Sequence, residues 1–496
     1  MSLPGSPTKG AGVSLFPQAF HGYLYALWTL YIISIGVWIL LQKRSPVSTL
    51  TWILTLSFIP VLGFFIYYLF GPKKIIRHRL SRRSSRLIVE RNYALWNRFV
   101  QHDGLPEEYQ SMARLVFNTT NIPLCHSLDY RLLSGGEQTY DAIFDAIRKA
   151  RKYILLEYYI FETDQTGTAL RDLLTEKVKE GVRVYLLIDA LGSPLLTRRF
   201  MNGFIEAGGH LDFFHNITWR RLFSLVNFRN HRKIVVCDGV IGFTGGVNIT
   251  DTQDLRRNPN AFHDVHIQVS GPVVAWLESI FMEDWHYSTG DLSLLRELKK
   301  ITRKADNIEF IASEQSKTYR IQVIPSGPDS DYAPILRIMV SAMYRARQCI
   351  YLTTPYFVPD EASLFALTSA ALRGVDVRLL VPQRSDNLVV TLATQSWYED
   401  LIRAGVRVFE YTPRMLHTKT LVIDKDLSFI GSANFDYRSF FLNFEISVLC
   451  YEPEANSLLA QEFQETLLSA REVVLTKQGF AYRLLTSTAR LFSPLL

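Results

Sequence analysis

The sequence contains few cysteines, and their positions exclude a disulfide framework. Its four cysteines, Cys125, Cys237, Cys349 and Cys450, lie far apart in 496 residues and form no C-x-x-C pair. Three of them fall in apolar runs typical of strands, so we expect buried, reduced thiols. Histidines and cysteines at metal-ligand spacing are also absent, so the sequence predicts neither a bound metal nor a cofactor.

Charged residues are missing from two long apolar runs near the N-terminus. Residues 22–41 read GYLYALWTLYIISIGVWILL, 20 residues without a charge, and a second uncharged run ends in FIPVLGFFIYYLFGP at Pro72. A helix of about 20 apolar residues crosses a bilayer core of roughly 30 Å. Neither run has the polar face of an interfacial helix, and the first lacks the features of a signal peptide. We therefore expect two transmembrane helices within residues 1–72.

Acidic residues are missing from the segment that follows the second run. Residues 73–86, KKIIRHRLSRRSSR, carry seven Lys and Arg and no acid, whereas the loop between the two runs has only Lys43 and Arg44. The positive-inside rule then places the rest of the chain in the cytoplasm. We expect this basic linker, 73–120, to lie against anionic lipids. The net charge of +7 also favours anionic partners.

The soluble part of the chain repeats itself in four blocks that recur in one order. One such pair is EGVRVYLLI at 180–188 and RGVDVRLLV at 373–381. Each half alternates helical stretches with β-branched runs, so we expect an α/β fold of two lobes related by a pseudo-twofold axis. The expected lobes are 121–290 and 319–475, joined by a polar connector, 291–318. Two equivalent lobes would combine two half-sites into one site.

One repeated block carries the same polar residues at identical spacing in both halves. The segments NHRKIVVCDGVIGFTGGVN and LHTKTLVIDKDLSFIGSAN both read H-x-K-x4-D-x6-G-(G/S)-x-N. A single H-x-K on a strand is usually structural, but a full motif repeated in a duplicated chain favours a functional role. The pattern selects His231, Lys233, Asp238 and Asn248 in the first half, and His417, Lys419, Asp424 and Asn434 in the second.

Each motif is expected to form a β-hairpin that gathers its polar residues on one face. Counting outward from a two-residue turn at 239–240 places His231 opposite Asn248 and Lys233 opposite Gly246. Cross-strand partners share a face, so the three polar side chains converge on one patch. In the second half, a turn at 425–426 gives the pairs His417 with Asn434 and Lys419 with Ser432.

The residue types in these patches suit chemistry on a phosphate diester. A neutral imidazole can attack phosphorus or carry a proton near pH 7, and Lys and Asn can hold charged oxygens. One histidine would form a phosphohistidine, while the other protonates the departing alcohol and deprotonates the incoming one. Asp264 and Glu445, from the fourth repeated block, could orient the imidazoles. By parity, Asp238 and Asp424 lie on the opposite face and shape the hairpins. The candidate catalytic residues are therefore His231, Lys233, Asp238, His417, Lys419 and Asp424, supported by Asn248, Asn434, Ser432, Asp264 and Glu445.

On these residues the chain resembles the phospholipase D superfamily, whose mark is the duplicated H-x-K-x4-D-x6-G-(G/S)-x-N motif. The apolar runs before such a domain, the stretches RNHRKIVVCDG and SFFLNFEIS, and the ending FAYRLLTSTARLFSPLL are similar to those of bacterial cardiolipin synthases. The resemblance covers roughly residues 120–470 and implies a two-lobed α/β fold, a covalent phosphohistidine and no metal. Gly246 stands where many members have serine, which removes one hydroxyl donor.

The resemblance also implies a reaction and a location. In a bacterial cytoplasmic (inner) membrane, one phosphatidylglycerol would give its phosphatidyl group to a histidine and release glycerol. A second phosphatidylglycerol would then accept the group and form cardiolipin. Tethering the site beside the bilayer raises the local concentration of lipid alcohols over water.

Other functions share part of this evidence. A hydrolytic phospholipase D or another phosphatidyltransferase would use every one of the same catalytic residues. A membrane-tethered nuclease would explain the basic charge, but no segment resembles a nucleic-acid-binding module, so no nucleic-acid partner is expected. A non-catalytic membrane scaffold is disfavoured because both halves keep their His and Lys.

The C-terminal segment 476–496 is expected to form an amphipathic tail. Leucines at 484, 485 and 491 lie among Arg and Ser residues, which predicts a short helix with one apolar face. That face would lie on a membrane surface or pack onto the catalytic domain.

Overall fold

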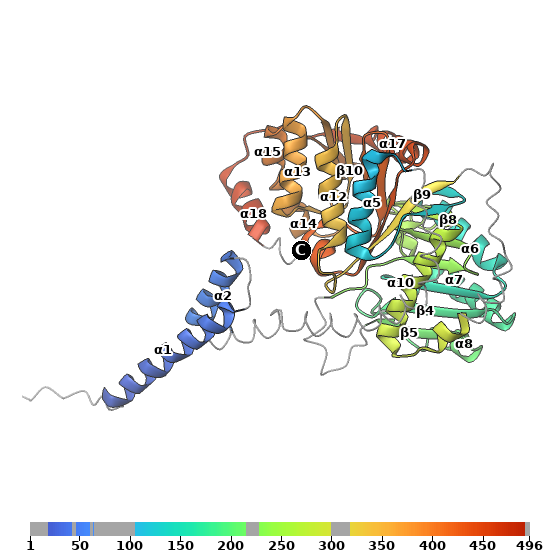
Figure 1. Ribbon diagram of the computed structural model, residues 1–496, viewed down its shortest axis with the longest axis horizontal. Coiled ribbons are helices and arrows are strands. Elements are labelled where there is room, and N and C mark those ends of the chain that lie inside the picture. The colour runs from blue at the N-terminus through green and yellow to red at the C-terminus, as the bar shows by residue number, and fades with distance from the viewer. Residues whose placement is uncertain are drawn as a thin grey trace, which may run out of the picture. The chain divides into compact units, whose positions relative to one another are not determined.

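The protein divides into two compact units, Met1–Lys74 and Ile75–Leu496 (Figure 1). The computed structural model describes residues 18–41, 46–59, 63, 105–214, 228–298 and 318–491. The end of the second predicted membrane span, most of the basic linker and most of the predicted connector lie outside the described residues.

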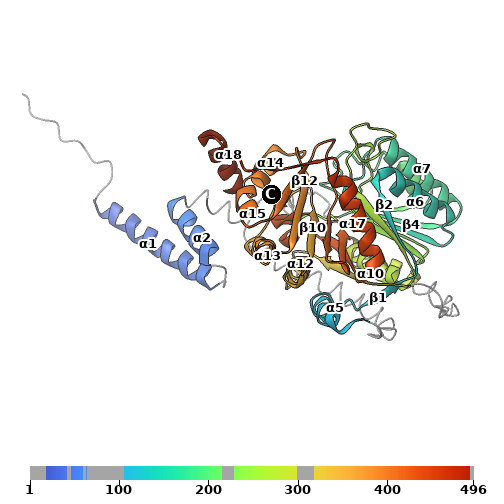
Figure 2. The same cartoon turned by 90° about the horizontal axis from the view of Figure 1, so that it is seen from above.

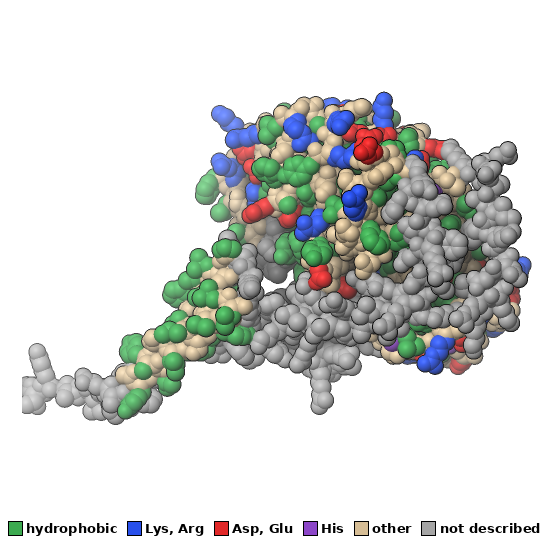
Figure 3. All heavy atoms as spheres, viewed as in Figure 1, with side chains coloured by type: hydrophobic (Ala, Val, Ile, Leu, Met, Phe, Trp, Pro, Cys, Tyr) green, Lys and Arg blue, Asp and Glu red, His purple; other side chains and the backbone are tan. Residues whose placement is uncertain are grey.

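The smaller unit contains two helices without a charged residue, α1 (Gln18–Leu40) and α2 (Pro46–Phe58). Their contact buries Ile39 and Leu56, while hydrophobic side chains are spread along their surface (Figure 3). Among the described residues, no helix combines the length and the apolar character needed to cross a membrane. The predicted pair of transmembrane helices therefore stays a prediction.

The larger unit is built on two mixed sheets with the same strand order. The first sheet contains β2 (Tyr130–Ser134), β3 (Tyr153–Tyr158), β4 (Arg183–Asp189), β5 (His210–Phe214), β6 (Ile234–Cys237), β7 (Ile241–Gly245) and β8 (Val265–Ser270). The second contains β1 (Cys125–Ser127), β9 (Tyr319–Ser326), β10 (Cys349–Thr353), β12 (Asp376–Pro382), β13 (Arg407–Tyr411), β14 (Thr420–Ile423), β15 (Leu427–Gly431), β17 (Glu445–Cys450) and β18 (Ala470–Glu472). The orders are β2-β8-β7-β6-β3-β4-β5 and β1-β9-β17-β15-β14-β10-β12-β13-β18. Without the edge strands β1 and β18 they match one to one, which confirms the predicted α/β fold of two similar lobes.

Helices cover the outer faces of both sheets and fill the space between them. The outer helices of the first lobe are α6 (Gly135–Lys149), α7 (Gln165–Lys179) and α8 (Asn202–Glu206). Those of the second are α12 (Pro334–Arg345), α13 (Glu361–Leu372) and α15 (Tyr398–Arg403). Between the sheets, α10 (Pro272–Thr289) and α17 (Pro453–Leu467) share one apolar core with strands of both lobes (Figure 2). This common core holds the two half-sites in register.

Equivalent helices begin with equivalent residues in the two lobes. The Asp164 carboxylate accepts a hydrogen bond from the third residue of α7, and Asp360 does the same at the start of α13. Proline occupies the first position of α10 and of α17, where its missing N–H costs nothing. The duplication thus extends from the strand order to the residues that begin the helices.

A segment that precedes the first lobe packs with the second. Strand β1 pairs antiparallel with β9, at the edge of the second sheet. Helix α5 (Glu107–Thr120) buries Met112 and Val116 in the outer core of that lobe. The sequence analysis placed α5 in the linker and β1 in the first lobe. In the structure, both elements pack against the second lobe.

The hairpins that carry the motifs have three-residue loops, so the predicted register was wrong by one residue. Cys237 pairs with Ile241, and Ile423 pairs with Leu427. The first loop residue of each hairpin is an aspartate in the left-handed region, with φ of 56° at Asp238 and 51° at Asp424. Aspartate tolerates this conformation better than most residues.

The loop aspartates gain backbone hydrogen bonds in return for this strained conformation. The Asp238 carboxylate accepts N–H groups of three consecutive residues, Arg151 to Tyr153, at 2.7–2.9 Å. Asp424 accepts the equivalent groups of residues 347–349 at 2.7–3.2 Å. Three such bonds to a carboxylate stabilise the turn and fasten each hairpin to the strand beside it.

The C-terminal helix α18 (Phe480–Leu491) packs through its small and polar side chains. Thr486 and Ala489 are buried, and Ala489 shares an apolar cluster with α14 (Leu388–Gln395). Tyr482 Oη donates to Gln395 Oε1 at 2.6 Å. The large apolar side chains remain exposed: Phe480, Leu484, Leu485 and Leu491. Contact of this apolar face with a membrane stays a prediction.

Candidate active site

A cavity of about 440 Å³ lies between the two lobes, and both motif histidines line it. His231 comes just before β6 and His417 just before β14, so each hairpin presents its histidine at the same end. Asn248 and Asn434, which follow β7 and β15, also line the cavity. The two motifs therefore contribute to one site, although their histidines are 186 positions apart in the sequence (417 − 231).

Each histidine is paired with a carboxylate from the opposite lobe. His231 Nδ1 lies 3.0 Å from Glu445 Oε2, and His417 Nδ1 lies 2.5 Å from Asp264 Oδ2. The sequence selected both carboxylates but did not indicate that the pairing is crossed. A reciprocal arrangement of this kind is what a twofold relation between the lobes produces.

Backbone hydrogen bonds between the lobes set up the crossed pairs. Asn230 forms a parallel bridge with Phe444, and His263 forms one with Leu416. The N–H of His231 donates to Phe444 O at 2.9 Å, and the N–H of His417 donates to the His263 carbonyl at 2.7 Å. In each bridge, the histidine of one lobe and the carboxylate of the other are the next residues along the chain. The bridges therefore bring each imidazole to its carboxylate.

The two carboxylates are ionised despite complete burial. Burial alone would raise the pKa of Glu445, but His231, Lys233 and a 2.5 Å hydrogen bond from Ser432 Oγ hold that pKa below its ordinary value. Burial would likewise raise the pKa of Asp264, and Lys419 and His417 outweigh it. An ionised carboxylate accepts the Nδ1–H of an imidazole and so leaves the other ring nitrogen with its lone pair.

The histidines themselves are neutral near pH 7. Burial lowers the pKa of His231 to about 4, against the opposing effect of Glu445. Burial and the positive charge of Lys419 also lower the pKa of His417. Neutral imidazoles whose Nδ1 is engaged by a carboxylate are suited to nucleophilic attack and proton transfer through Nε2.

The motif lysines lie behind the imidazoles and do not line the cavity. Lys233 Nζ donates to the carbonyl of His231 at 2.8 Å, and Lys419 Nζ donates to the carbonyl of His417. Burial lowers the pKa of Lys233 to about 7. Their expected contact with phosphate oxygens stays a prediction, and Asp238 lies outside the cavity wall in its hairpin loop.

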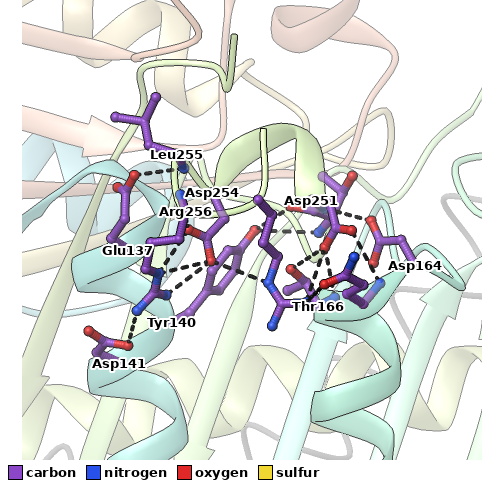
Figure 4. A network of polar contacts seen from close by, with 12 residues as sticks. Glu137, Tyr140, Asp141, Asp164, Thr166, Asp251, Asp254, Leu255 and Arg256 are labelled. Carbon is purple, nitrogen blue, oxygen red and sulfur yellow. Dashed lines mark hydrogen bonds and ion pairs between the residues drawn. The ribbon is translucent and has the colours of Figure 1, made fainter. Parts of the chain in front are cut away.

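A network of polar contacts fastens the loop that follows Asn248 (Figure 4). This loop supplies three further residues of the cavity wall, Thr250, Thr252 and Gln253. Asp251 Oδ1 accepts the N–H and the hydroxyl of Thr166 at 2.8 and 2.7 Å. Tyr140 Oη donates to the carbonyl of Asn248 at 2.6 Å. At the far end of the loop, the N–H of Leu255 donates to Glu137. The guanidinium of Arg256 pairs with Asp254 and Asp141. The loop holds Gln253 Nε2 at 3.3 Å from the Asp264 carboxylate.

Gly246 and Ser432 occupy equivalent positions but support their carboxylates differently. A Cβ atom on Gly246 would lie 2.0 Å from Asp264 Oδ1, so no side chain fits there. In the other lobe the longer Glu445 leaves room for Ser432, whose hydroxyl binds it. The glycine that departs from the family pattern is thus matched to the shorter carboxylate.

Replacing Gly246 with serine is expected to lower activity by about 10²-fold, because it displaces Asp264 and with it the imidazole of His417. Initial rates on phospholipid vesicles measure the change. Gly203→Ala serves as the control, since nothing lies within 4 Å of the added Cβ. Wild-type rates in Gly246→Ser would contradict this account of the glycine.

Most of the lining residues were missed by the sequence analysis, and five of them bear on the chemistry of the site. They are Tyr159, Arg229, Gln253, Arg438 and Asn443. The ring of Tyr159 meets that of His231 edge-on at 4.7 Å between centroids. Two of the five could have been found, because Arg229 and Asn443 stand two residues before His231 and Glu445. The other three come from loops and helices outside the motif.

Comparison with known proteins identifies the family of the chain. The family model described as "Cardiolipin synthase, PLD-like domain" matches residues 143–285 and 339–467, and the model "Phospholipase_D-nuclease N-terminal" matches 29–72. Over 490 residues the chain is 36% identical to a cardiolipin synthase of Alkalihalophilus pseudofirmus, covering 96% of this chain and 94% of that protein. The chain belongs to the cardiolipin synthase family. A cardiolipin synthase of Halalkalibacterium halodurans is 35% identical over 485 residues, with 96% and 94% coverage.

Membership of the cardiolipin synthase family confirms the resemblance inferred from the duplicated motif. A crystal structure of phosphatidylserine synthase from Haemophilus influenzae shares the fold, with a TM-score of 0.57 and 14% identity over 78% of this chain and all of that one. The match to the N-terminal family model and the cardiolipin synthase relatives indicate membrane association. Among the described residues, no group of three or more potential metal ligands gathers; catalysis without a metal stays a prediction.

Proposed function

We propose that this member of the cardiolipin synthase family transfers a phosphatidyl group from one phosphatidylglycerol to another and releases glycerol. The observation that supports this best is the pair of crossed histidine–carboxylate dyads on one cavity. Two imidazoles at one phosphorus suit a double displacement, since the neutral one can be the nucleophile while the other, once protonated, supplies the proton to the leaving alcohol.

The reaction proceeds in two balanced steps. In the first, Nε2 of one neutral histidine attacks the phosphorus of the donor lipid and the P–O bond to glycerol breaks. The other histidine, which takes up a solvent proton on Nε2 when the anionic donor lipid binds, donates that proton to the leaving oxygen. In the second, that histidine removes the proton from the hydroxyl of the acceptor lipid, whose oxygen attacks phosphorus and releases the first histidine. Asp264 and Glu445 stabilise the positive charge that each imidazole gains, and Asn248 and Asn434 donate to the charged phosphate oxygens.

Hydrolysis is the main alternative, because water could replace the acceptor alcohol. The test uses the full chain in phosphatidylglycerol vesicles, with mass spectrometry of the lipids and an assay for free glycerol. We expect one cardiolipin for each glycerol released. Phosphatidic acid in place of cardiolipin would contradict the transferase and favour a phospholipase D. Adding phosphatidylethanolamine to the vesicles shows whether it also serves as acceptor.

We further propose that residues 1–72 anchor the enzyme as a transmembrane hairpin, with the catalytic unit in the cytoplasm. The uncharged helices α1 and α2 and the seven basic residues at 73–86 support this arrangement. Protease treatment of spheroplasts that carry a C-terminally tagged enzyme tests the orientation. The tag should be protected until the membrane is opened; cleavage from outside would contradict it.

A further inference from the structure

The cavity is asymmetric in the residues that line it, although the two half-sites are repeats of each other. Arg229 stands two residues before His231, whereas Met415 stands two residues before His417. Asn443 stands two residues before Glu445, whereas Phe262 stands two residues before Asp264. Arg229, Asn443 and Phe262 all line the cavity, and the Phe262 ring lies 5.8 Å from that of His417. At these two equivalent positions, the His231 side is therefore polar and basic where the His417 side is apolar.

Two arginines from different lobes line the cavity on the His231 side. Arg229 Nη1 donates to Tyr159 Oη at 3.1 Å, next to the His231 ring. Arg438, on α16 (Tyr437–Phe441), lines the same wall, and burial followed by the charge of Arg229 lowers its pKa. Within the described part of the chain, Arg229 Nε is buried and has no hydrogen-bond partner. Two neighbouring guanidiniums in a partly buried wall favour the binding of an anion.

The carboxylates near Arg229 and Arg438 do not take the place of a bound anion, because they are engaged in other hydrogen bonds. Asp436 Oδ1 accepts the N–H of Ser439 at 2.7 Å as the cap of α16, and burial raises the pKa of Asp436 to about 6. Asp386 accepts from Tyr356 Oη at 2.7 Å. Asp189, which does not line the cavity, accepts three backbone N–H groups, including that of Asn230. Each of these carboxylates already has a hydrogen-bonding role in the protein.

The product of the proposed reaction has a second phosphate that the histidines do not bind. Its two phosphodiesters are joined through the three carbons of one glycerol, so the acceptor lipid carries its phosphate three carbons from the attacking hydroxyl. We propose that Arg229 and Arg438 bind the phosphodiester of the acceptor lipid and so place its hydroxyl at the reacting phosphorus. The inference rests on the proposed transfer to phosphatidylglycerol. It assigns the two halves different tasks, with the acceptor phosphate on the His231 side.

Free glycerol provides an acceptor that lacks this phosphate. An enzyme that forms a phosphatidyl-histidine also passes the group back to glycerol, so labelled glycerol enters phosphatidylglycerol through the same intermediate. Cardiolipin formation needs the acceptor phosphate site and glycerol exchange does not. The ratio of the two rates therefore isolates binding of the acceptor phosphate from the chemistry at the histidines.

The decisive variant is Arg229→Met, which installs the residue of the other half. We expect cardiolipin formation to fall at least about tenfold more than glycerol exchange, because a charge-assisted hydrogen bond to phosphate is lost. Arg438→Gln should show the same split, and Arg229→Lys should recover part of it. Arg407→Met, which breaks a surface ion pair with Glu472, is the matched control and should change neither rate.

The experiment distinguishes failure of the acceptor site from failure of the proposed function. If Arg229→Met and Arg438→Gln lower the two rates equally, or lower neither, the acceptor site is refuted while the transferase stands. If the wild-type enzyme exchanges glycerol but forms no cardiolipin, the proposed transfer fails and the acceptor site with it.

Discussion

Replacing either His231 or His417 with alanine is expected to lower phosphatidyl transfer by about 10⁴-fold or more, with the fold retained. Both imidazoles line one cavity, and the proposed reaction needs both, one for the bond to phosphorus and the other for the proton. Removing one member of such a unit typically costs nearly as much as removing the whole. Lipid mass spectrometry gives the activity, and circular dichroism with a thermal melt verifies the fold.

His263→Ala is the matched control for these variants. His263 also pairs with a carboxylate, since its Nε2 lies 2.8 Å from Glu462 Oε1, but it does not line the cavity. We expect it to keep activity within about tenfold of wild type, because it loses only packing and a structural contact with Glu462 outside the cavity. Substantial activity in either cavity variant would mean that one half-site suffices, which contradicts the joint site.

The second large effect is expected from the crossed carboxylates. Asp264→Asn should lower kcat by about 10²- to 10⁴-fold, because an amide no longer fixes the Nδ1–H tautomer or stabilises the imidazolium. Glu445→Gln should act in the same way on His231, which belongs to the other lobe. Glu462→Gln removes the charge from the comparable pair outside the cavity and should have little effect on kcat.

NMR spectra of the imidazoles show whether each carboxylate orients its histidine or only packs against it. In ¹⁵N spectra of the imidazoles, Asp264→Asn should change the tautomer of His417 and leave that of His231 unchanged. Glu445→Gln should do the reverse. Since Glu445 raises the pKa of His231 against the effect of burial, its removal should also lower that pKa further. A change at the histidine of the same lobe would contradict the crossed pairing.

The repeated blocks were enough to predict the two-lobed fold, and the repeated motif selected four residues that line the cavity, His231, Asn248, His417 and Asn434. His231 and His417 could be found because spacing along a strand is a local property that a duplication makes visible. The hairpin register was predicted wrongly because Asp238 adopts a left-handed conformation that its side-chain hydrogen bonds favour. The tolerance of aspartate for this conformation is a local property, but the backbone N–H groups that bind its carboxylate lie about 85 residues away in the sequence.

Other features depend on contacts between the lobes and leave little trace in the sequence. The crossing of Asp264 and Glu445 follows from the backbone bridges at Asn230 and His263, which form only when the lobes pack. Strand β1 precedes the first lobe but pairs with the second, and hydrophobic pattern alone does not select its partner. The sequence analysis did not select Arg229, because a search for repeats finds only residues that are the same in both halves.

The account depends on two displacements at one phosphorus atom, and stereochemistry at phosphorus measures this most directly. Phosphatidylglycerol made chiral at phosphorus with sulfur in place of one oxygen would be converted by the full chain, and the product configuration read by ³¹P NMR. Two in-line displacements through a phosphatidyl-histidine predict overall retention. Inversion would mean that the acceptor attacks the donor lipid directly, and would contradict the covalent role of the paired histidines.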